Sequence, residues 1–104
     1  MQNDLRSFSE AGIKPNAIIK RLMEMMYVYL LESISHPGQR YVGITGDLKA
    51  RIKDHNTGRS SYTSKYAPWQ TKVVIKFTND RNADSFERYL KSGSGHAFAQ
   101  RHFW

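Results

Sequence analysis

The chain has 104 residues, which is enough for one domain with one hydrophobic core and too few for two. It has no cysteine, which excludes disulfides and thiolate zinc sites. Residues 1–26 hold no long apolar run that would suggest a signal peptide or membrane span, so we expect a cytoplasmic protein. The formal net charge of +7 lies within residues 40–104, where twelve basic residues stand against five acidic ones. Such a basic half is typical of a polyanion-binding protein, although an ordinary solvated surface gives the same count.

The first part of the chain predicts an extension followed by a β-hairpin. Residues 1–24 are broken up by serine, glycine and proline, and a short helix is expected to begin at Pro15. An apolar strand is predicted over residues 26–32 and a second over residues 40–45, with a turn at residues 36–38 between them.

A helix, a loop and a third strand are predicted next. Asp47 is a suitable N-cap for a helix that ends near residues 56–58, and a polar loop over residues 59–68 follows it. The third strand, over residues 72–78, is predicted from the alternation of Val73, Ile75 and Phe77 with polar residues.

A second long helix is predicted from an N-cap at Asn79 or Asp80 through Lys91. Two glycines, Gly93 and Gly95, are expected to separate it from a last short helix over residues 96–102.

The two strands of the hairpin carry tyrosines that are expected to share a face of the sheet. Eleven residues separate Tyr29 from Tyr41, and the alternation of side chains places Tyr27 with Tyr29 and Gly43 with Tyr41. Aromatic residues on paired strands usually pack on each other, but a glycine inside a strand often marks close approach by a ligand or by backbone. Two phenols beside Gly43 therefore predict a phosphate pocket. A tyrosine base there would need cationic neighbours, because a free phenol titrates near pH ~10.

Arg51 and His55 lie one helical turn apart, on the flank of an apolar stripe formed by Leu48 and Ile52, so both are expected to face the sheet. A histidine in such a place is more often a satisfied, half-buried residue than a catalyst. An arginine there stays charged, and its fork matches a phosphate group.

Glu87 is the sharpest anomaly of the second long helix, because it falls on the border of an apolar stripe that consists of Ala83, Phe86 and Leu90. A carboxylate at the edge of a buried face is costly unless a cation or hydrogen-bond donors accompany it. The pattern predicts either a structural ion pair, with Arg51 or Arg88 as the partner, or a ligand for Mg²⁺.

Five short motifs occur in a fixed order along the chain, and together they carry a family resemblance. They are Tyr27-Val28-Tyr29, Tyr41-Val42-Gly43, Arg51 ten residues after Tyr41, His55-Asn56-x-Gly58, and Glu87-Arg88-Tyr89-Leu90-Lys91. With this order and spacing, the chain from about residue 25 to residue 102 resembles the GIY-YIG endonuclease superfamily, in particular its small stand-alone bacterial and phage members. The chain departs from the family in carrying Tyr27 where glycine is common, and in having no asparagine after Asn82, where many members carry a late polar residue.

The resemblance implies an α/β fold, with a three-stranded antiparallel β-sheet flanked by α-helices over residues 25–104, and metal-dependent hydrolysis of phosphodiester bonds. By position, Tyr29 would be the general base or would orient the attacking water, and Tyr41 would hydrogen-bond in the same cluster. Arg51 would stabilise the transition state and His55 would assist proton movement or position the phosphate. Glu87 would hold Mg²⁺ or Mn²⁺, which polarises the phosphate and stabilises the leaving oxygen.

The expected partner is DNA, branched or containing single strands, with low sequence specificity. The tyrosines of the polar loop could stack on exposed bases. The loop is equally consistent with an ordinary solvent-exposed connection that has no role in binding. Contacts to nucleic acid are predicted for Gly43, Lys49, Lys53, Asn56, Arg59, Lys65 and Lys91. Two alternatives remain: a nucleic-acid-binding module that has lost catalysis, and a small basic RNA-binding protein, which would explain the charge but not Glu87.

Overall fold

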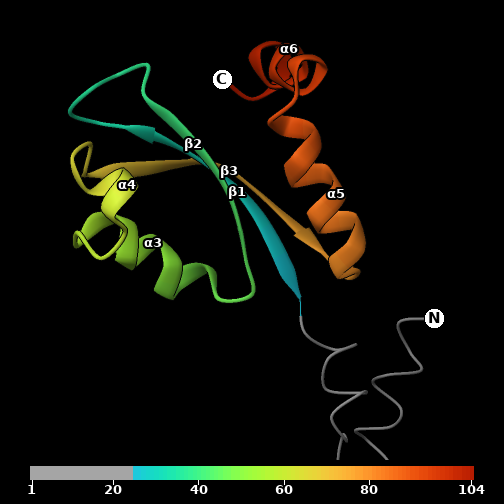
Figure 1. Cartoon of the computed structure of the whole chain (residues 1–104), viewed down its shortest axis with the longest axis horizontal. Coiled ribbons are helices and arrows are strands. Elements are labelled where there is room, and N and C mark those ends of the chain that lie inside the picture. The colour runs from blue at the N-terminus through green and yellow to red at the C-terminus, as the bar shows by residue number, and fades with distance from the viewer. Residues whose placement is uncertain (1–24) are drawn as a thin grey trace, which may run out of the picture.

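The computed structural model describes residues 25–104, which form a three-stranded antiparallel sheet with helices packed against it (Figure 1). β1 (Met26–Ser33) lies at the centre, between β2 (Arg40–Thr45) and β3 (Trp69–Phe77). The helices are α3 (Leu48–Asn56), α4 (Ser61–Ser64), α5 (Asp80–Leu90) and α6 (Gly93–His102). This arrangement confirms the predicted fold class. The helix expected from Pro15 lies outside the described residues, and no helix within residues 25–104 is long and apolar enough to cross a membrane.

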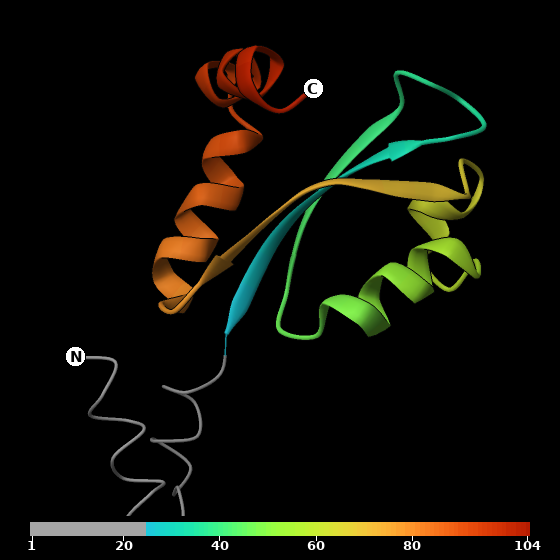
Figure 2. The same cartoon turned by 180° about the vertical axis from the view of Figure 1, so that it is seen from behind.

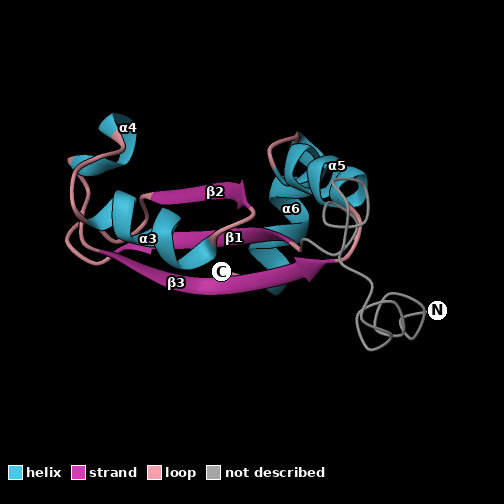
Figure 3. Cartoon of the chain, turned by 90° about the horizontal axis from the view of Figure 1, so that it is seen from below, coloured by secondary structure: helices cyan, strands magenta, loops and turns pink. Residues whose placement is uncertain are grey.

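The central strand β1 is apolar on both faces because both faces are covered. Val28 and Leu30 are fully buried in a cluster with residues of α5 and α6, whereas Tyr29 and Leu31 are fully buried on the other face with Trp69 and α3 side chains. α3 and α4 gather toward one end of the strands and α5 and α6 toward the other, as the views from behind and from below show (Figures 2 and 3). Each large buried side chain stabilises the fold by roughly 1.5–3 kcal/mol, so β1 is a rigid support for Tyr29.

The hairpin of β1 and β2 has the register that brings its tyrosines together. Tyr29 pairs with Gly43 and Leu31 pairs with Tyr41, so the two phenols are diagonal neighbours on one face of the sheet. The predicted bounds of both strands are confirmed to within one residue.

The connection between α3 and β3 is more ordered than predicted. The predicted loop contains the one-turn helix α4, and β3 begins at Trp69, three residues before its expected start. The reason is that Trp69 is anchored twice: its backbone N–H donates to Oδ1 of Asn56 at 2.6 Å, and its indole N–H donates to the carbonyl of Thr63 at 3.0 Å. Trp69 also pairs with Ser33 of β1, so the pairing of β3 with β1 continues to the last residue of β1.

The predicted starts of α3 and α5 are confirmed, because the side chains of Asp47 and Asn79 cap them. The start of α6 was predicted wrongly. Ser92 caps it, and its two glycines lie within the helix rather than before it. Gly95 is required there by close packing, since a Cβ at this position would lie 1.7 Å from the carbonyl oxygen of Tyr89 at the end of α5.

Candidate active site

The candidate site is built around a buried contact between Tyr29 of β1 and His55 of α3. Both side chains are fully buried, and the phenol oxygen of Tyr29 lies 2.8 Å from Nε2 of His55. His55 reaches the sheet because it stands in the last turn of α3, one turn after the partly buried Ile52 that packs on the same face. The prediction that His55 faces the sheet is therefore confirmed.

Thr63 of α4 fixes the other side of the imidazole ring. Its hydroxyl lies 2.7 Å from Nδ1 of His55 and donates to the carbonyl of Ser60 at 3.4 Å. Because the threonine proton is directed at that carbonyl, its oxygen accepts from Nδ1–H, which leaves Nε2 of His55 as the acceptor for Tyr29. Burial, followed by the charge of Arg51, lowers the pKa of His55 below its ordinary value, which favours the neutral ring over the imidazolium.

Tyr41 and Arg51 complete the cluster. The ring of Tyr41 lies 4.8 Å from that of His55 and 6.2 Å from that of Tyr29, between centroids. The guanidinium of Arg51 is near enough to both phenols to interact with them electrostatically. Burial and the phenol of Tyr41 raise the pKa of Tyr29 to about 12, although Arg51 acts to lower it. Tyr29 is therefore a neutral phenol at physiological pH, and the cationic neighbour expected from the sequence is outweighed by burial.

Gly43 is needed because the ring of Tyr29 lies over it. A Cβ at position 43 would lie 2.4 Å from both Cζ and the hydroxyl oxygen of Tyr29, a distance that no side chain can adopt. The sequence predicted close approach at Gly43 by a ligand or backbone, and in the structure the approaching group is the phenol.

Glu87 of α5 is only 8 % exposed, and its carboxylate pairs with the ammonium of Lys91 at 2.5 Å, one helical turn further on. The predicted ion pair exists, but its predicted partners are wrong. Arg88 pairs with Asp84, and Arg51 lies 4.0 Å from Asp54 on α3. The i, i+4 spacing places the long stem of Lys91 over the carboxylate.

The carboxylate of Glu87 also suits a divalent cation. No group of three or more His, Cys, Asp or Glu side chains converges anywhere in residues 25–104, so a cation at Glu87 would depend on this carboxylate, water and a substrate phosphate. That is a usual ligand set for Mg²⁺, which keeps several of its waters. The pair with Lys91 shows that a cation can reach this carboxylate, and a divalent cation there would have to share it with the ammonium or displace it.

The residues predicted to contact nucleic acid lie in different surroundings. Four of them are exposed or at the surface of α3 and the following loop, and they are Lys49, Lys53, Arg59 and Lys65. Asn56 instead uses its amide oxygen to hold the backbone of Trp69. Lys91 borders a pocket. Their contacts with nucleic acid stay a prediction.

Sequence reasoning missed Thr63, which orients His55. A hydroxyl residue in a region predicted to be a polar loop carries no signal of its own. The available clue was the Ser60-Ser61-Tyr62-Thr63 run, in which a serine can begin a helical turn. Such a turn brings Thr63 back toward the end of α3, eight residues from His55.

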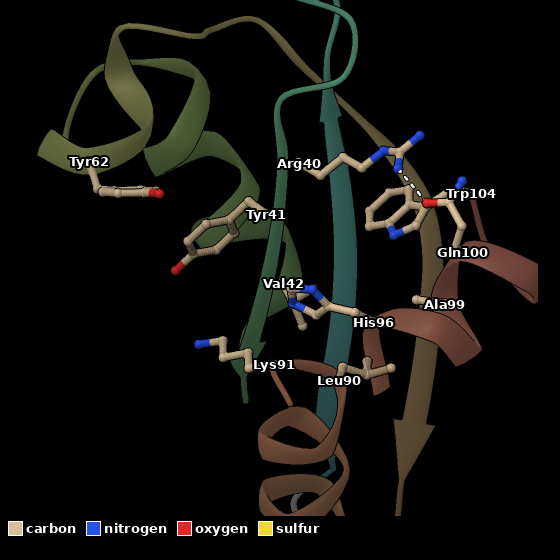
Figure 4. A pocket seen from close by; sticks show the side chains of 10 residues that line it. All are labelled: Arg40, Tyr41, Val42, Tyr62, Leu90, Lys91, His96, Ala99, Gln100 and Trp104. Atoms are coloured by element: carbon tan, nitrogen blue, oxygen red, sulfur yellow. Dashed lines mark hydrogen bonds between the residues drawn. The ribbon is translucent and has the colours of Figure 1, made fainter. Parts of the chain in front are cut away.

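A pocket of about 660 Å³ opens beside this cluster, bounded by β2, α4 and the two C-terminal helices (Figure 4). Tyr41 and Tyr62 lie at one end of it and Arg40 and Trp104 at the other, and the hydroxyl of Tyr41 points to the same side as the ammonium of Lys91. Tyr41 thus belongs both to the buried cluster and to the pocket wall, and Lys91 connects the pocket to Glu87.

Comparison with known proteins gives a consistent result. Residues 25–99 match the GIY-YIG catalytic domain. The chain is 42% identical over 69 residues to the structure-specific endonuclease subunit SLX1 homolog of Drosophila mojavensis, a match that covers 58% of this chain and 23% of that protein. It is 35% identical over 82 residues to the structure-specific endonuclease subunit SLX1 of Candida dubliniensis, covering 72% and 27% of the two chains.

A relative of more similar length is the UPF0213 protein CPE1444 of Clostridium perfringens, which is 38% identical over 68 residues, covering 64% of this chain and 71% of that protein. The chain spans about a quarter of the length of the two SLX1 relatives. No solved structure gave a significant match. The domain match includes the hairpin, the Arg51–His55 helix and Glu87, which are the elements that build the cluster and its carboxylate, and the chain belongs to the GIY-YIG family.

Proposed function

We propose that the protein is a metal-dependent endonuclease that hydrolyses phosphodiester bonds in DNA, with low sequence specificity or selectivity for branched structure. The observation that carries the proposal is a set of polar groups that leads from the pocket to the core: Tyr41, whose ring centroid lies 6.2 Å from that of Tyr29, and then the hydrogen-bonded pair of Tyr29 and His55. Two relatives are named as structure-specific endonuclease subunits, which supports selectivity for structure over sequence.

The chain of polar groups gives the attacking water a route for its proton. Tyr29 and His55 are fully buried and do not touch solvent, whereas Tyr41 lines the pocket. Tyr41 is therefore the phenol that contacts the water, and the neighbouring Tyr29 hydrogen-bonds onward to Nε2 of His55. A phenol with a pKa of about 12 cannot act as a preformed base, so Tyr29 passes a proton inward while it receives one.

Arg51 supplies the positive charge at the reacting phosphate. Its guanidinium is held against both phenols, and its side chain remains 38% exposed, so it can also reach a substrate. A fixed cation at this position stabilises charge that develops on the phosphoryl oxygens in the transition state. A divalent cation held by Glu87 would add polarisation of the phosphate and stabilisation of the leaving oxygen.

The proposal is tested by nicking of supercoiled plasmid with Mg²⁺ or Mn²⁺, with and without a chelator. We expect nicking that the chelator stops, and its loss in Glu87→Gln, which keeps the shape of the side chain and removes the charge. Asp84→Asn is the matched control, because Asp84 is an exposed carboxylate on the same helix, paired with Arg88. The control should cut like the wild type.

Two results would contradict the proposal in different ways. DNA binding without any nicking would support the alternative of a nucleic-acid-binding module. Metal-dependent nicking that survives in Glu87→Gln would leave the nuclease in place but remove Glu87 as the metal ligand, and the ion pair with Lys91 would then be its role.

A further inference from the structure

We infer that the pocket beside Tyr41 holds an unpaired nucleotide of the substrate, with its base stacked on Tyr62 and its phosphates near Lys91 and His96. The inference rests on the proposed function, and it adds the feature of DNA that the site recognises. It is carried by an exposed aromatic ring, a set of cations and a hollow shape, all at one place next to the candidate active site.

Tyr62 offers a free ring face at the mouth of the pocket. It is 70% exposed, more than any other large hydrophobic side chain in the described part of the chain. Its ring centroid lies 6.2 Å from that of Tyr41, so a base stacked on Tyr62 would lie next to the phenol that contacts the attacking water. Aromatic side chains in this setting stack on bases without regard to sequence.

The lining of the pocket has the charge that a nucleotide needs. Arg40, Lys91 and His96 contribute basic groups, and no carboxylate is among the side chains that line the pocket within residues 25–104. Two of these cations also pair with carboxylates outside the lining, Arg40 with Glu32 at 3.5 Å and Lys91 with Glu87, so the phosphate would share them with those partners. Arg40 is fixed at the far end: its guanidinium donates to Oε1 of Gln100 at 3.1 Å and lies 4.7 Å from the centroid of the Trp104 ring. The far wall is thereby rigid before any ligand arrives.

The shape of the pocket selects an unpaired nucleotide over a duplex. A duplex presents its phosphates on a convex surface and keeps the faces of its bases inside the stack, so it cannot bring a base face to Tyr62. A nucleotide at a flap or junction is already unstacked and can enter a hollow of about 660 Å³. The pocket would thus place the cleaved phosphate next to a strand branch.

Equilibrium binding without metal tests this inference apart from cleavage. The full chain in EDTA is titrated into two fluorescent DNA probes that share one nicked duplex, and the second probe also carries a single-stranded flap at the nick. The variants are Tyr62→Ala, which removes the ring, and Tyr62→Trp, which keeps a stacking surface. Ile34→Ala is the matched control, because Ile34 is 55% exposed and does not line the pocket.

We expect the wild type to prefer the flap, and Tyr62→Ala to bind the flap about 5- to 150-fold more weakly, the usual effect of losing one stacked base. Binding to the nicked duplex should not change, and Tyr62→Trp should restore the preference. Equal weakening on both probes, no weakening, or a tryptophan variant as weak as the alanine variant would overturn the inference. Each variant is first shown to unfold thermally like the wild type. A protein that never nicks DNA would contradict the proposed function, but the flap preference could still be measured, because this binding experiment does not depend on cleavage.

Discussion

Tyr29 and Gly43 face each other across the β1–β2 pairing, and the phenol of Tyr29 occupies the space that a side chain at position 43 would fill. The position of the phenol next to His55 therefore depends on a glycine in the neighbouring strand. The backbone at Gly43 does not have the positive φ that favours glycine, so contact with the ring alone excludes a larger residue.

Gly43→Ala should consequently damage both stability and activity. The added methyl group must push the buried ring away, which typically costs about 1–3 kcal/mol of unfolding free energy in a packed core. It should also break the contact between Tyr29 and His55, so that cleavage falls more than the stability loss explains. Gly46→Ala is the control, since a Cβ there would lie 3.5 Å from Sδ of Met26, an ordinary contact. A stable, fully active Gly43→Ala protein would show that the ring can relocate.

Tyr29→Phe removes only the hydroxyl and so separates packing from proton transfer. We expect the fold to persist with a loss of about 1–3 kcal/mol, because Nε2 of the buried His55 loses its donor. Cleavage should fall by a factor of about 10²–10⁴, the usual contribution of a positioned acid–base group. Tyr27→Phe, on the same strand and outside the cluster, should be near wild type in both measurements. A wild-type rate in Tyr29→Phe would remove Tyr29 from the proton route.

The sequence predicted the strands and the helix caps well because these depend on local patterns. The alternation around Val73 and the capping residues Asp47 and Asn79 act within a few positions, and the structure confirms all of them. The one-turn helix α4 was missed because it is held by tertiary contacts, the hydrogen bonds of Thr63 to His55 and of the Trp69 indole to the Thr63 carbonyl.

The same distinction explains what could be predicted of the candidate site. Residue types and spacing placed Tyr29, Tyr41, Arg51 and His55 on facing surfaces, and the structure brings these four together. Which phenol contacts solvent depends on how deeply each ring is buried, and that follows from the covering side chains rather than from strand alternation. The pocket joins β2 to residues sixty positions away, such as Gln100, and no local pattern reports such a contact.

The affinity for DNA should depend strongly on salt. The twelve basic residues of the stretch 40–104 release counterions when they neutralise phosphates, and a protein with several such contacts loses about 10³–10⁵ in affinity between low and physiological salt. Titration of a duplex probe at several salt concentrations measures the slope. An affinity that stays flat across this range would mean that the charge is only a solvated surface.

His55 should make the fold sensitive to acid. Burial lowers its pKa in the folded chain below the ordinary value of 6.5, so the unfolded chain binds the proton more readily. The free energy of unfolding must therefore decrease as the pH falls below about 6.5 toward the folded pKa, and it is retained above that range. Urea unfolding between about pH 8 and pH 5 should show this loss, and His55→Gln should have a flatter profile. His96→Gln, at an exposed position, should keep the wild-type slope.

The ammonium of Lys91 pairs with the carboxylate of Glu87, which is also the proposed metal ligand. The ammonium and the metal should therefore compete for this carboxylate. Lys91→Met keeps much of the side-chain volume and removes the charge. Because Lys91 is 54% exposed, its pairing with Glu87 is partly screened and is worth up to about 1 kcal/mol. The variant should then bind Mn²⁺ up to roughly fivefold more tightly in calorimetric titration without DNA.

Arg88→Met is the matched control for this titration. Arg88 is a neighbouring cation on the same helix face, but it pairs with Asp84 rather than with Glu87. Its removal should leave the Mn²⁺ affinity close to that of the wild type, and adding Glu87→Gln to Lys91→Met should abolish the gain. An unchanged Mn²⁺ affinity in Lys91→Met would mean that metal and ammonium do not share the carboxylate. Equal gains in both arginine and lysine variants would point to the general surface charge rather than to the Glu87–Lys91 pair.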